Sequence, residues 1–291
     1  MVKGFKSTHY KISIKLKSDL PFCYSKKASG VLMSEHNVLY QQVGNVVTIT
    51  YNRPERNNAI NGEMRKELNA AWTQFYEDES AWVAILTGSG KTFCAGADLK
   101  DSEGSTGNFK GTFWEKPTIN SFESGQEIFK PVIAAVNGPC VGYGLTAVTF
   151  CDFVIASETA TFSYPEVRIG IPTIVGAIRL PKKLNWSDAM ELLLIGKPVS
   201  ANRAKEMGLV WKVCEEDQLL GEANELAVQL CESAPLAVRA TKEVAQRTQN
   251  MSWIESVRFG ETMRIVANQT NDATEGISAF KEKRDPKWQG K

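Results

Sequence analysis

Hydrophobic residues recur with two different periods along the chain, and the first of these predicts strands near the start. Residues 38–40 and 46–51 are rich in β-branched and aromatic side chains, and Gly44 and Asn45 separate the two runs. This arrangement is typical of a hairpin with a tight turn. Between residues 60 and 78, apolar side chains recur every three or four positions. That spacing predicts an amphipathic helix.

Further along, short apolar runs alternate with turns and a helix. Three runs predict buried strands: residues 82–87, 132–136 and 153–156. A helix near residues 144–151 comes between the second run and the third, and this order predicts right-handed crossovers in a largely parallel sheet. After Ser187 the pattern is nearly all helical. Three helix stops are expected there: Gly196, Gly208 and Pro235. The predicted fold class is therefore α/β, followed by a helical region.

Length and composition are those of an ordinary globular protein. The chain has 291 residues, of which 43% are hydrophobic and 23% charged, so it is long enough to bury a core in one or two domains. No apolar run approaches the roughly 18 residues of a membrane helix. A net charge of +1 gives no broad field to attract nucleic acid. We therefore expect no membrane span and no nucleic-acid partner.

The first 32 residues differ in composition from the rest. They contain seven lysines, one acidic residue and no arginine, and the balance changes near Met33. A mitochondrial targeting segment is one interpretation, although such segments are usually rich in arginine. We favour an optional extension that packs poorly, so that a chain beginning at Met33 folds and stays active. The expected organisation is an extension over residues 1–32, a core over 33–200 and a helical region over 201–291.

Histidine and cysteine usage excludes several kinds of site. Both histidines, His9 and His36, come within the first 36 residues, so the remainder has no Ser-His-Asp triad and no histidine zinc ligand. The six cysteines include no C-x-x-C pair, so neither a zinc ribbon nor a thioredoxin-type site is indicated. A reducing compartment is the default interpretation, and we expect the cytoplasm. Carboxylates, lysines and backbone amides remain as candidates for chemistry.

One apparent motif is a decoy. Residues 88–92 read Gly-Ser-Gly-Lys-Thr after a predicted strand and resemble the end of a phosphate-binding loop. The full motif requires a glycine five residues before Gly90, where the chain has Ile85. We interpret this stretch as a tight turn.

Two other turns are stronger candidates for chemistry. Small residues at 93–99 follow a strand, and residues 137–144 lead from a strand into a helix whose first amides have no intrahelical partner. Such amides at the positive end of a helix stabilise an anion. One amide from each turn could hold a carbonyl oxygen as it becomes an oxyanion.

Five blocks in order carry a family resemblance: residues 52–59, 93–98, 130–138, 162–170 and 279–284. In this order they resemble the crotonase, or enoyl-CoA hydratase/isomerase, family from about Val38 to the end of the chain. The resemblance implies a ββα spiral core, a C-terminal helical oligomerisation region and a homotrimer or homohexamer. It also implies an acyl-CoA thioester substrate with no metal and no other cofactor, since coenzyme A is part of the substrate. By position it assigns the two enolate-stabilising amides to Ala97 and Tyr143.

The sequence departs from the hydratase pattern at one catalytic position. Hydratases of the family typically carry two glutamates, and the matching positions here are Thr146 and Glu166. The resemblance assigns the acid/base role to Glu166. One base can remove a proton at one carbon and return it two carbons away, as a double-bond isomerase requires. Glu115, Glu123 and Glu127 are candidates for a replacement carboxylate.

Further residues are expected to bind the substrate. Phe113 and Trp114 are candidates for the acyl pocket, and residues 170–176 replace a glycine-rich run common among hydratases, so the pocket shape is expected to differ. The resemblance places coenzyme A phosphates and adenine near the following residues: Arg53, Arg56, Ala95, Asp98, Phe280 and Lys283. Arginine and lysine suit phosphate by charge.

The predicted function is an enoyl-CoA hydratase or isomerase, and both reactions stay open. The tail at residues 285–288 resembles bacterial proteins called hydratases, whereas Thr146 favours isomerisation or another one-base reaction. A non-catalytic member that binds acyl-CoA or RNA is the alternative from another class. The retained Glu166 argues against a non-catalytic acyl-CoA-binding member. The lack of a basic cluster in the folded body argues against an RNA-binding member.

Overall fold

The structure, a computed structural model, describes residues 36–100 and 121–291. By its internal contacts the chain divides into two units, and every described residue belongs to the second, Glu35–Lys291. The proposed N-terminal extension, the pocket candidates Phe113 and Trp114, and the candidate replacement carboxylate Glu115 lie outside the described residues. None of the helices in the described part is long and apolar enough to cross a membrane.

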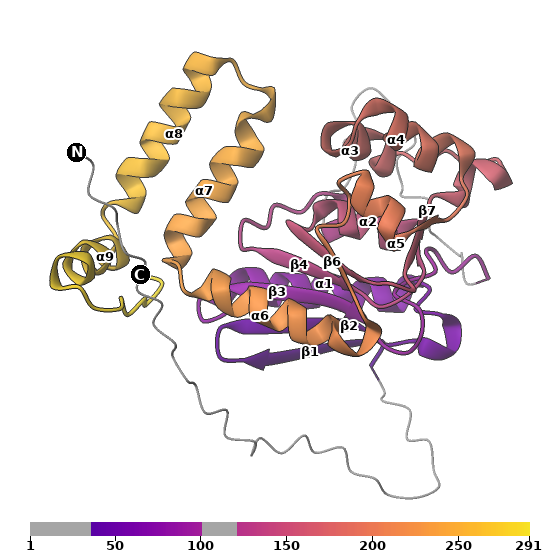
Figure 1. Cartoon of the computed structure of the whole chain (residues 1–291), viewed down its shortest axis with the longest axis horizontal. Helices are drawn as coiled ribbons and strands as arrows, with labels where there is room; N and C mark the ends of the chain where they lie inside the picture. The colour runs from indigo at the N-terminus through magenta and orange to yellow at the C-terminus, as the bar shows by residue number, and fades with distance from the viewer. Residues whose placement is uncertain (1–35, 101–120) are drawn as a thin grey trace, which may run out of the picture. The chain divides into compact units, whose positions relative to one another are not determined.

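A six-stranded sheet forms the centre of this unit, in the order β1-β2-β3-β4-β6-β9. Its strands are β1 (Val38–Val43), β2 (Val46–Tyr51), β3 (Val83–Gly88), β4 (Val132–Val136), β6 (Phe153–Ser157) and β9 (Lys212–Cys214). The first two are antiparallel, and every later pair is parallel. The hairpin turns at Gly44, whose φ of 58° favours glycine. The predicted hairpin, buried strands and parallel sheet are confirmed (Figure 1).

Helices cover both faces of the sheet because alternate strand residues point to opposite sides. Leu86 and Ala134 pack with the apolar face of α1 (Gly62–Glu77), whereas Ile85 and Ile133 pack with α6 (Leu219–Cys231). The predicted boundary at residue 200 falls inside this unit, since β9 is an edge strand of the main sheet and α6 covers one face of that sheet.

A second sheet of three short strands carries part of the candidate site. β5 (Cys140–Val141) runs parallel to β7 (Thr161–Ser163), and β8 (Val199–Ser200) pairs antiparallel with β7. Around it lie α2 (Tyr143–Phe150), α3 (Val175–Lys183), α4 (Trp186–Met190), η4 (Glu191–Ile195) and α5 (Ala201–Glu206). β8 and β9 interrupt the stretch after Ser187 that was predicted to be nearly all helical. Strands of two or three residues are too short to show an alternation of apolar and polar side chains, so the sequence does not reveal them.

Helix α2 connects the second sheet to the core, and two cations hold its C-terminal end. Arg179 donates to the carbonyl oxygen of Thr149 at 2.8 and 3.2 Å, and Lys183 donates to that of Cys151 at 2.9 Å. These carbonyls have no partner within the helix, and positive charge is favourable there. The opposite end of α2 begins at Tyr143, next to the glycine turn of residues 137–142.

Three more helices complete the chain: α7 (Pro235–Arg247), α8 (Trp253–Ala267) and α9 (Asn271–Glu282). Pro235 opens α7 instead of ending the helix before it, because proline is accepted at the first helical position. Ser252 and Glu255 form a capping box at the start of α8. No residue of α8 is buried, and Trp253 is 83% exposed. Short helices also form at Glu216–Gln218 and Thr248–Asn250.

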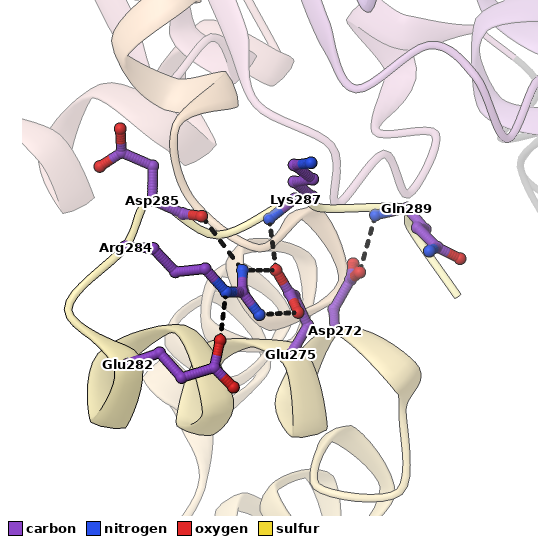
Figure 2. A network of polar contacts seen from close by, with 7 residues as sticks. All are labelled: Asp272, Glu275, Glu282, Arg284, Asp285, Lys287 and Gln289. Atoms are coloured by element: carbon purple, nitrogen blue, oxygen red, sulfur yellow. Dashed lines mark hydrogen bonds and ion pairs between the residues drawn. The ribbon is translucent and has the colours of Figure 1, made fainter.

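The last residues fold back on α9 through a polar network (Figure 2). Arg284 makes a bidentate pair with Glu275 at 2.6 and 2.9 Å and a second pair with Glu282. Buried Asp272 accepts hydrogen bonds from the backbone amides of Gln289 and Gly290 at 2.7 and 2.9 Å. Charge-assisted bonds of this kind are stronger than neutral ones, so the network holds the tail against the helix.

Candidate functional site

Two loops that are far apart in sequence are joined by backbone hydrogen bonds. The amide of Cys94 donates to the carbonyl oxygen of Pro139 at 3.1 Å, and the amide of Val141 donates to that of Cys94 at 2.9 Å. We call residues 94–98 the first loop and residues 139–143 the second loop. Their pairing brings Gly96 beside Gly142.

Both of these positions require glycine. Gly96 has a φ of 92° and Gly142 a φ of 54°, in the region that side chains rarely adopt. A Cβ placed on Gly96 would lie 3.2 Å from the carbonyl oxygen of Val141. A Cβ placed on Gly142 would lie 2.7 Å from Oε1 of Glu166. The absence of side chains therefore lets the two loops and the Glu166 carboxyl approach one another.

Each loop has one amide without a hydrogen-bond partner in the described part of the chain. The backbone on either side of Ala97 bonds to Ile60. The Ile60 amide donates to the carbonyl oxygen of Gly96, and the Ile60 carbonyl oxygen accepts from the amide of Asp98. Tyr143 is the first residue of α2, where an amide has no acceptor within the helix. Among the described residues, neither the Ala97 amide nor the Tyr143 amide donates a hydrogen bond. Both residues line the same cavity.

This cavity has a volume of about 360 Å³. Most of its described lining is apolar, and Glu166 is its only described charged side chain. The lining residues from the two loops and α2 are Ala95, Gly96, Ala97, Leu99, Val141, Gly142, Tyr143 and Thr146. The other wall consists of Pro165, Glu166, Ile169, Ile171, Pro172, Thr173, Ile174 and Val175. Of the predicted site residues, the fold thus brings five together here: Ala95, Ala97, Tyr143, Thr146 and Glu166.

Glu166 lies in the short helix η3 (Pro165–Ile169), directly after β7. Its Oε2 atom is buried and has no hydrogen-bond partner among the described residues. Burial raises the pKa of this carboxyl, and its own backbone amide and the nearby Thr173 hydroxyl oppose the rise only in part. A carboxyl with a raised pKa is a stronger proton acceptor than an exposed one, as a general base requires.

Thr146 is buried in α2, and its hydroxyl lies 3.1 Å from the Tyr164 hydroxyl. Tyr164 is also fully buried, and desolvation raises the pKa of its phenol, so the group stays neutral. Sequence reasoning missed Tyr164 although it directly precedes the Pro165-Glu166 pair. The position that carries a glutamate in typical hydratases is therefore occupied here by a hydroxyl that is bonded to a second hydroxyl.

The predicted phosphate ligand Arg53 is an ion-pair partner of Asp98. Its Nη1 lies 3.3 Å from the Asp98 carboxylate and also donates to the carbonyl oxygen of Ala59, and the side chains of Arg53 and Asp98 are 11% and 12% exposed. Buried Asn58 fixes the same segment by donating to Ser89 and Thr92 at 2.9 and 2.6 Å. The 88–92 turn predicted in place of a phosphate loop is thus held by Asn58.

The remaining coenzyme A candidates do not line the cavity. Arg56 is exposed at the end of η1 (Pro54–Arg56), Phe280 is 85% exposed on α9, and Lys283 follows the last residue of that helix. Their contact with substrate stays a prediction.

The two described candidates for a replacement carboxylate have partners elsewhere. Glu123, in η2 (Phe122–Ser124), is 5% exposed and pairs with Arg65 at 3.1 Å. Arg65 also lies over the Tyr143 ring, 4.7 Å from its centroid. Glu127 is paired with Arg247. Within residues 36–100 and 121–291, no cluster of histidine, cysteine and acidic side chains is placed to hold a metal ion.

Comparison with known proteins identifies the family of the chain. The family model described as "Enoyl-CoA hydratase/isomerase" matches residues 41–291. The mevalonyl-coenzyme A hydratase of Aspergillus fumigatus is 38% identical over 250 residues, which cover 84% of this chain and 91% of the relative. The carnitinyl-CoA dehydratase of Salmonella enteritidis is 37% identical over 265 residues, covering 85% and 96%.

Solved structures give the same result. An enoyl-CoA hydratase/isomerase from Mycobacterium paratuberculosis superposes with a TM-score of 0.77 at 38% identity, covering 88% of this chain and 98% of the other. The predicted family, fold and enzyme class are therefore confirmed. The chain belongs to the enoyl-CoA hydratase/isomerase family and is an acyl-CoA-processing enzyme of that type.

Proposed function

We propose that the chain moves a proton at the α-carbon of an acyl-CoA thioester, with Glu166 as the acid/base and the amides of Ala97 and Tyr143 as donors to the thioester oxygen. One observation carries the proposal: two amides that have no partner within residues 36–100 and 121–291 line a single cavity together with a shielded carboxyl. Hydrogen-bond donors fixed where negative charge develops are usually the largest catalytic contribution in such sites.

In this mechanism the thioester oxygen accepts hydrogen bonds from both amides as the α-carbon loses its proton. Glu166 takes that proton, and the resulting enolate carries its charge on the oxygen between the amides. Because Gly142 lets Oε1 of Glu166 approach the second loop, the base and the amides can act on one bound thioester.

Removal or addition of water at the β-carbon is the reaction we favour. In the dehydration direction, the α C–H bond breaks and Glu166 accepts the proton, and the β C–O bond then breaks. The same proton passes from Glu166 to the leaving hydroxide, which departs as water, and Glu166 is again ionised. The names of the hydratase and dehydratase relatives support a reaction of this type.

Double-bond isomerisation is the second candidate, and the Thr146–Tyr164 pair favours it. A threonine hydroxyl can hydrogen-bond water but cannot take its proton near neutral pH. If no second base activates water, Glu166 can return the proton to the γ-carbon and so move the double bond by one position. The largely apolar lining supports an apolar acyl group for either reaction.

A homotrimer or homohexamer in the cytoplasm completes the proposal. Apolar side chains on α8 and α9 that are exposed in the single chain support a subunit contact there: Trp253, Ile254, Ile265, Val266, Ile277 and Phe280. Burial of such a surface is favourable, and large exposed apolar patches are uncommon on monomers.

The proposal is tested with wild type and Glu166→Gln against 2-enoyl-, 3-enoyl- and 3-hydroxyacyl-CoA substrates, monitored by ultraviolet absorbance and product mass. We expect the variant to lose about 10²–10⁴-fold in kcat, the usual contribution of a general base, while its affinity for a saturated acyl-CoA changes little. Glu127→Gln is the matched control, because Glu127 is 61% exposed and pairs with Arg247. Turnover by Glu166→Gln at the wild-type rate would overturn the assignment.

A further inference from the structure

Two buried polar atoms in the cavity wall lack hydrogen-bond partners among the described residues. They are Oε2 of Glu166 and Oγ1 of Thr173. An unsatisfied buried donor or acceptor opposes folding, so native proteins seldom keep one without a function. Here a carboxylate that can only accept and a hydroxyl that can donate line the same wall.

The backbone brings Thr173 back toward Glu166. Gly170 ends η3 with a φ of 80°, which reverses the chain, and the amide of Ile171 donates to the carbonyl oxygen of Glu166 at 3.0 Å. The segment after it therefore runs beside the carboxyl instead of away from it. Thr173 is close enough to influence the titration of Glu166 directly.

Packing also limits how the Thr173 side chain can turn. A Cβ placed on Gly176 would lie 2.7 Å from the Thr173 methyl carbon and 2.6 Å from Cζ of Tyr164. The methyl group is thus fixed against Gly176, close to the Tyr164 ring. The Thr173 hydroxyl is buried and has no partner among the described residues, so it is available as a donor.

We propose that Thr173 is a positioning residue whose hydroxyl donates a hydrogen bond to the Glu166 carboxylate and holds Oε1 toward Gly142 and the two amides. The inference rests on the proposed role of Glu166. Oε2 of that carboxylate has no bonded partner among the described residues, and the Thr173 hydroxyl is the side-chain donor that acts on the carboxyl beside its own backbone amide. A carboxylate that accepts one side-chain bond stays more basic than one that accepts several.

Thr173→Val and Thr173→Ser test the proposal. Valine keeps the shape and removes the donor, whereas serine keeps the donor and removes the methyl group. We expect valine to raise the midpoint of the acid limb of kcat/KM by roughly 0.5–1 pH unit, because the ionised form loses a hydrogen bond. We also expect kcat to fall roughly tenfold through misorientation of the base, with KM nearly unchanged. Serine should restore the wild-type midpoint.

A second measurement does not depend on turnover. The Glu166 carboxyl is followed by ¹³C NMR during a pH titration, its resonance being the one that is absent from Glu166→Gln. The proposal predicts a higher midpoint in Thr173→Val than in wild type or Thr173→Ser. Equal midpoints in all three proteins would overturn it. If wild type turned over no acyl-CoA, the proposed function would fail separately, while this titration would still decide the role of Thr173.

Discussion

Two carboxylates near the cavity have opposite surroundings. Oε2 of Glu166 is buried and has no bonded partner among the residues that the structure describes, and burial raises the pKa of this carboxyl. Glu123 is more deeply buried but is paired with Arg65 at 3.1 Å. Desolvation of an unpaired charge opposes folding, whereas removal of one partner of a buried pair leaves the other uncompensated. Glu166 is therefore kept at a cost to stability that the proposed chemistry explains.

This contrast predicts the sign of two stability changes. The carboxyl of Glu166 titrates above 4.5 in the folded protein, so its cost is absent below pH 4.5 and is fully present above the folded-state pKa. Glu166→Gln should therefore raise the melting temperature at pH 8 more than at pH 4.5. Glu123→Gln should lower the free energy of unfolding by about 1–2 kcal/mol, as loss of a charged hydrogen bond does. Calorimetry at both pH values checks this, and a destabilised Glu166→Gln protein would contradict it.

Thr146 stands where typical hydratases of the family carry a second glutamate. A glutamate at this position should raise the ratio of 2-enoyl-CoA hydration to 3-enoyl-CoA isomerisation, because a second carboxylate can activate water. The Tyr164 hydroxyl, 3.1 Å from that of Thr146, occupies part of the space a longer side chain needs. Thr146→Glu is therefore measured alone and together with Tyr164→Phe.

The ratio of the two rates is the observable. If wild type already hydrates 2-enoyl-CoA at roughly 10 s⁻¹ or more, a typical enzyme rate, Glu166 alone suffices or a further group assists it. In that case Thr146→Glu should leave the ratio unchanged, and Glu115 would be the first residue to test.

At the scale of elements, the paired glycine loops determine where the amides point. Gly142→Ala would place a methyl group 2.7 Å from Oε1 of Glu166 in a backbone conformation with a φ of 54°. Gly44→Ala is a matched control, because its φ is 58° and nothing lies within 4 Å of the added atom. Both variants should lose about 1 kcal/mol of stability from backbone strain.

Only Gly142→Ala should lose activity, by roughly 100-fold, because it displaces the base or the second loop. Thermal unfolding and steady-state kinetics of the two variants separate strain from chemistry. Equal activity in both would show that the approach of Glu166 to Gly142 has no catalytic importance.

Elements with a clear period could be predicted from the sequence, and elements without one could not. The helix at α1 and the strands from β1 to β6 in the main sheet follow apolar patterns of six or more residues, or buried runs bounded by turns. Strands β8 and β9 have two and three residues, which is too short for any pattern. They form because neighbouring strands offer backbone partners, a tertiary effect that no local sequence carries.

The same distinction applies to the site. The two glycine turns and Glu166 follow from local motifs, and the fold brings them to one cavity. In the opposite wall, Ile169 was not predicted, and Ile171 and Thr173 were expected only as part of a segment that changes the pocket shape, because their approach depends on the chain reversal at Gly170. Residues 170–176 did stand out as a departure from the family pattern, and that was the available signal. Pairing of Arg53 with Asp98 is also a tertiary contact.

For the whole molecule, the exposed apolar helices predict assembly. Light scattering should give three or six times the chain mass of 32.2 kDa. Trp253→Glu combined with Ile254→Glu should lower that mass, because burying the new charges in a subunit contact is costly. Val43→Glu is the control, since Val43 is equally exposed but lies on β1. A wild-type mass of a single chain would contradict the proposed assembly.

In the proposed mechanism Glu166 removes a proton from the α-carbon of a thioester whose oxygen is held by two backbone amides. Exchange of that proton tests it directly, without requiring the natural acyl group or the direction of reaction. A saturated acyl-CoA is incubated with the protein in deuterium oxide, and incorporation of deuterium at the α-carbon is followed by mass spectrometry. We expect exchange with wild type and with Glu127→Gln. With Glu166→Gln the exchange rate should fall by at least about 100-fold. Exchange at the wild-type rate in Glu166→Gln, or none in wild type with the ligand bound, would contradict it.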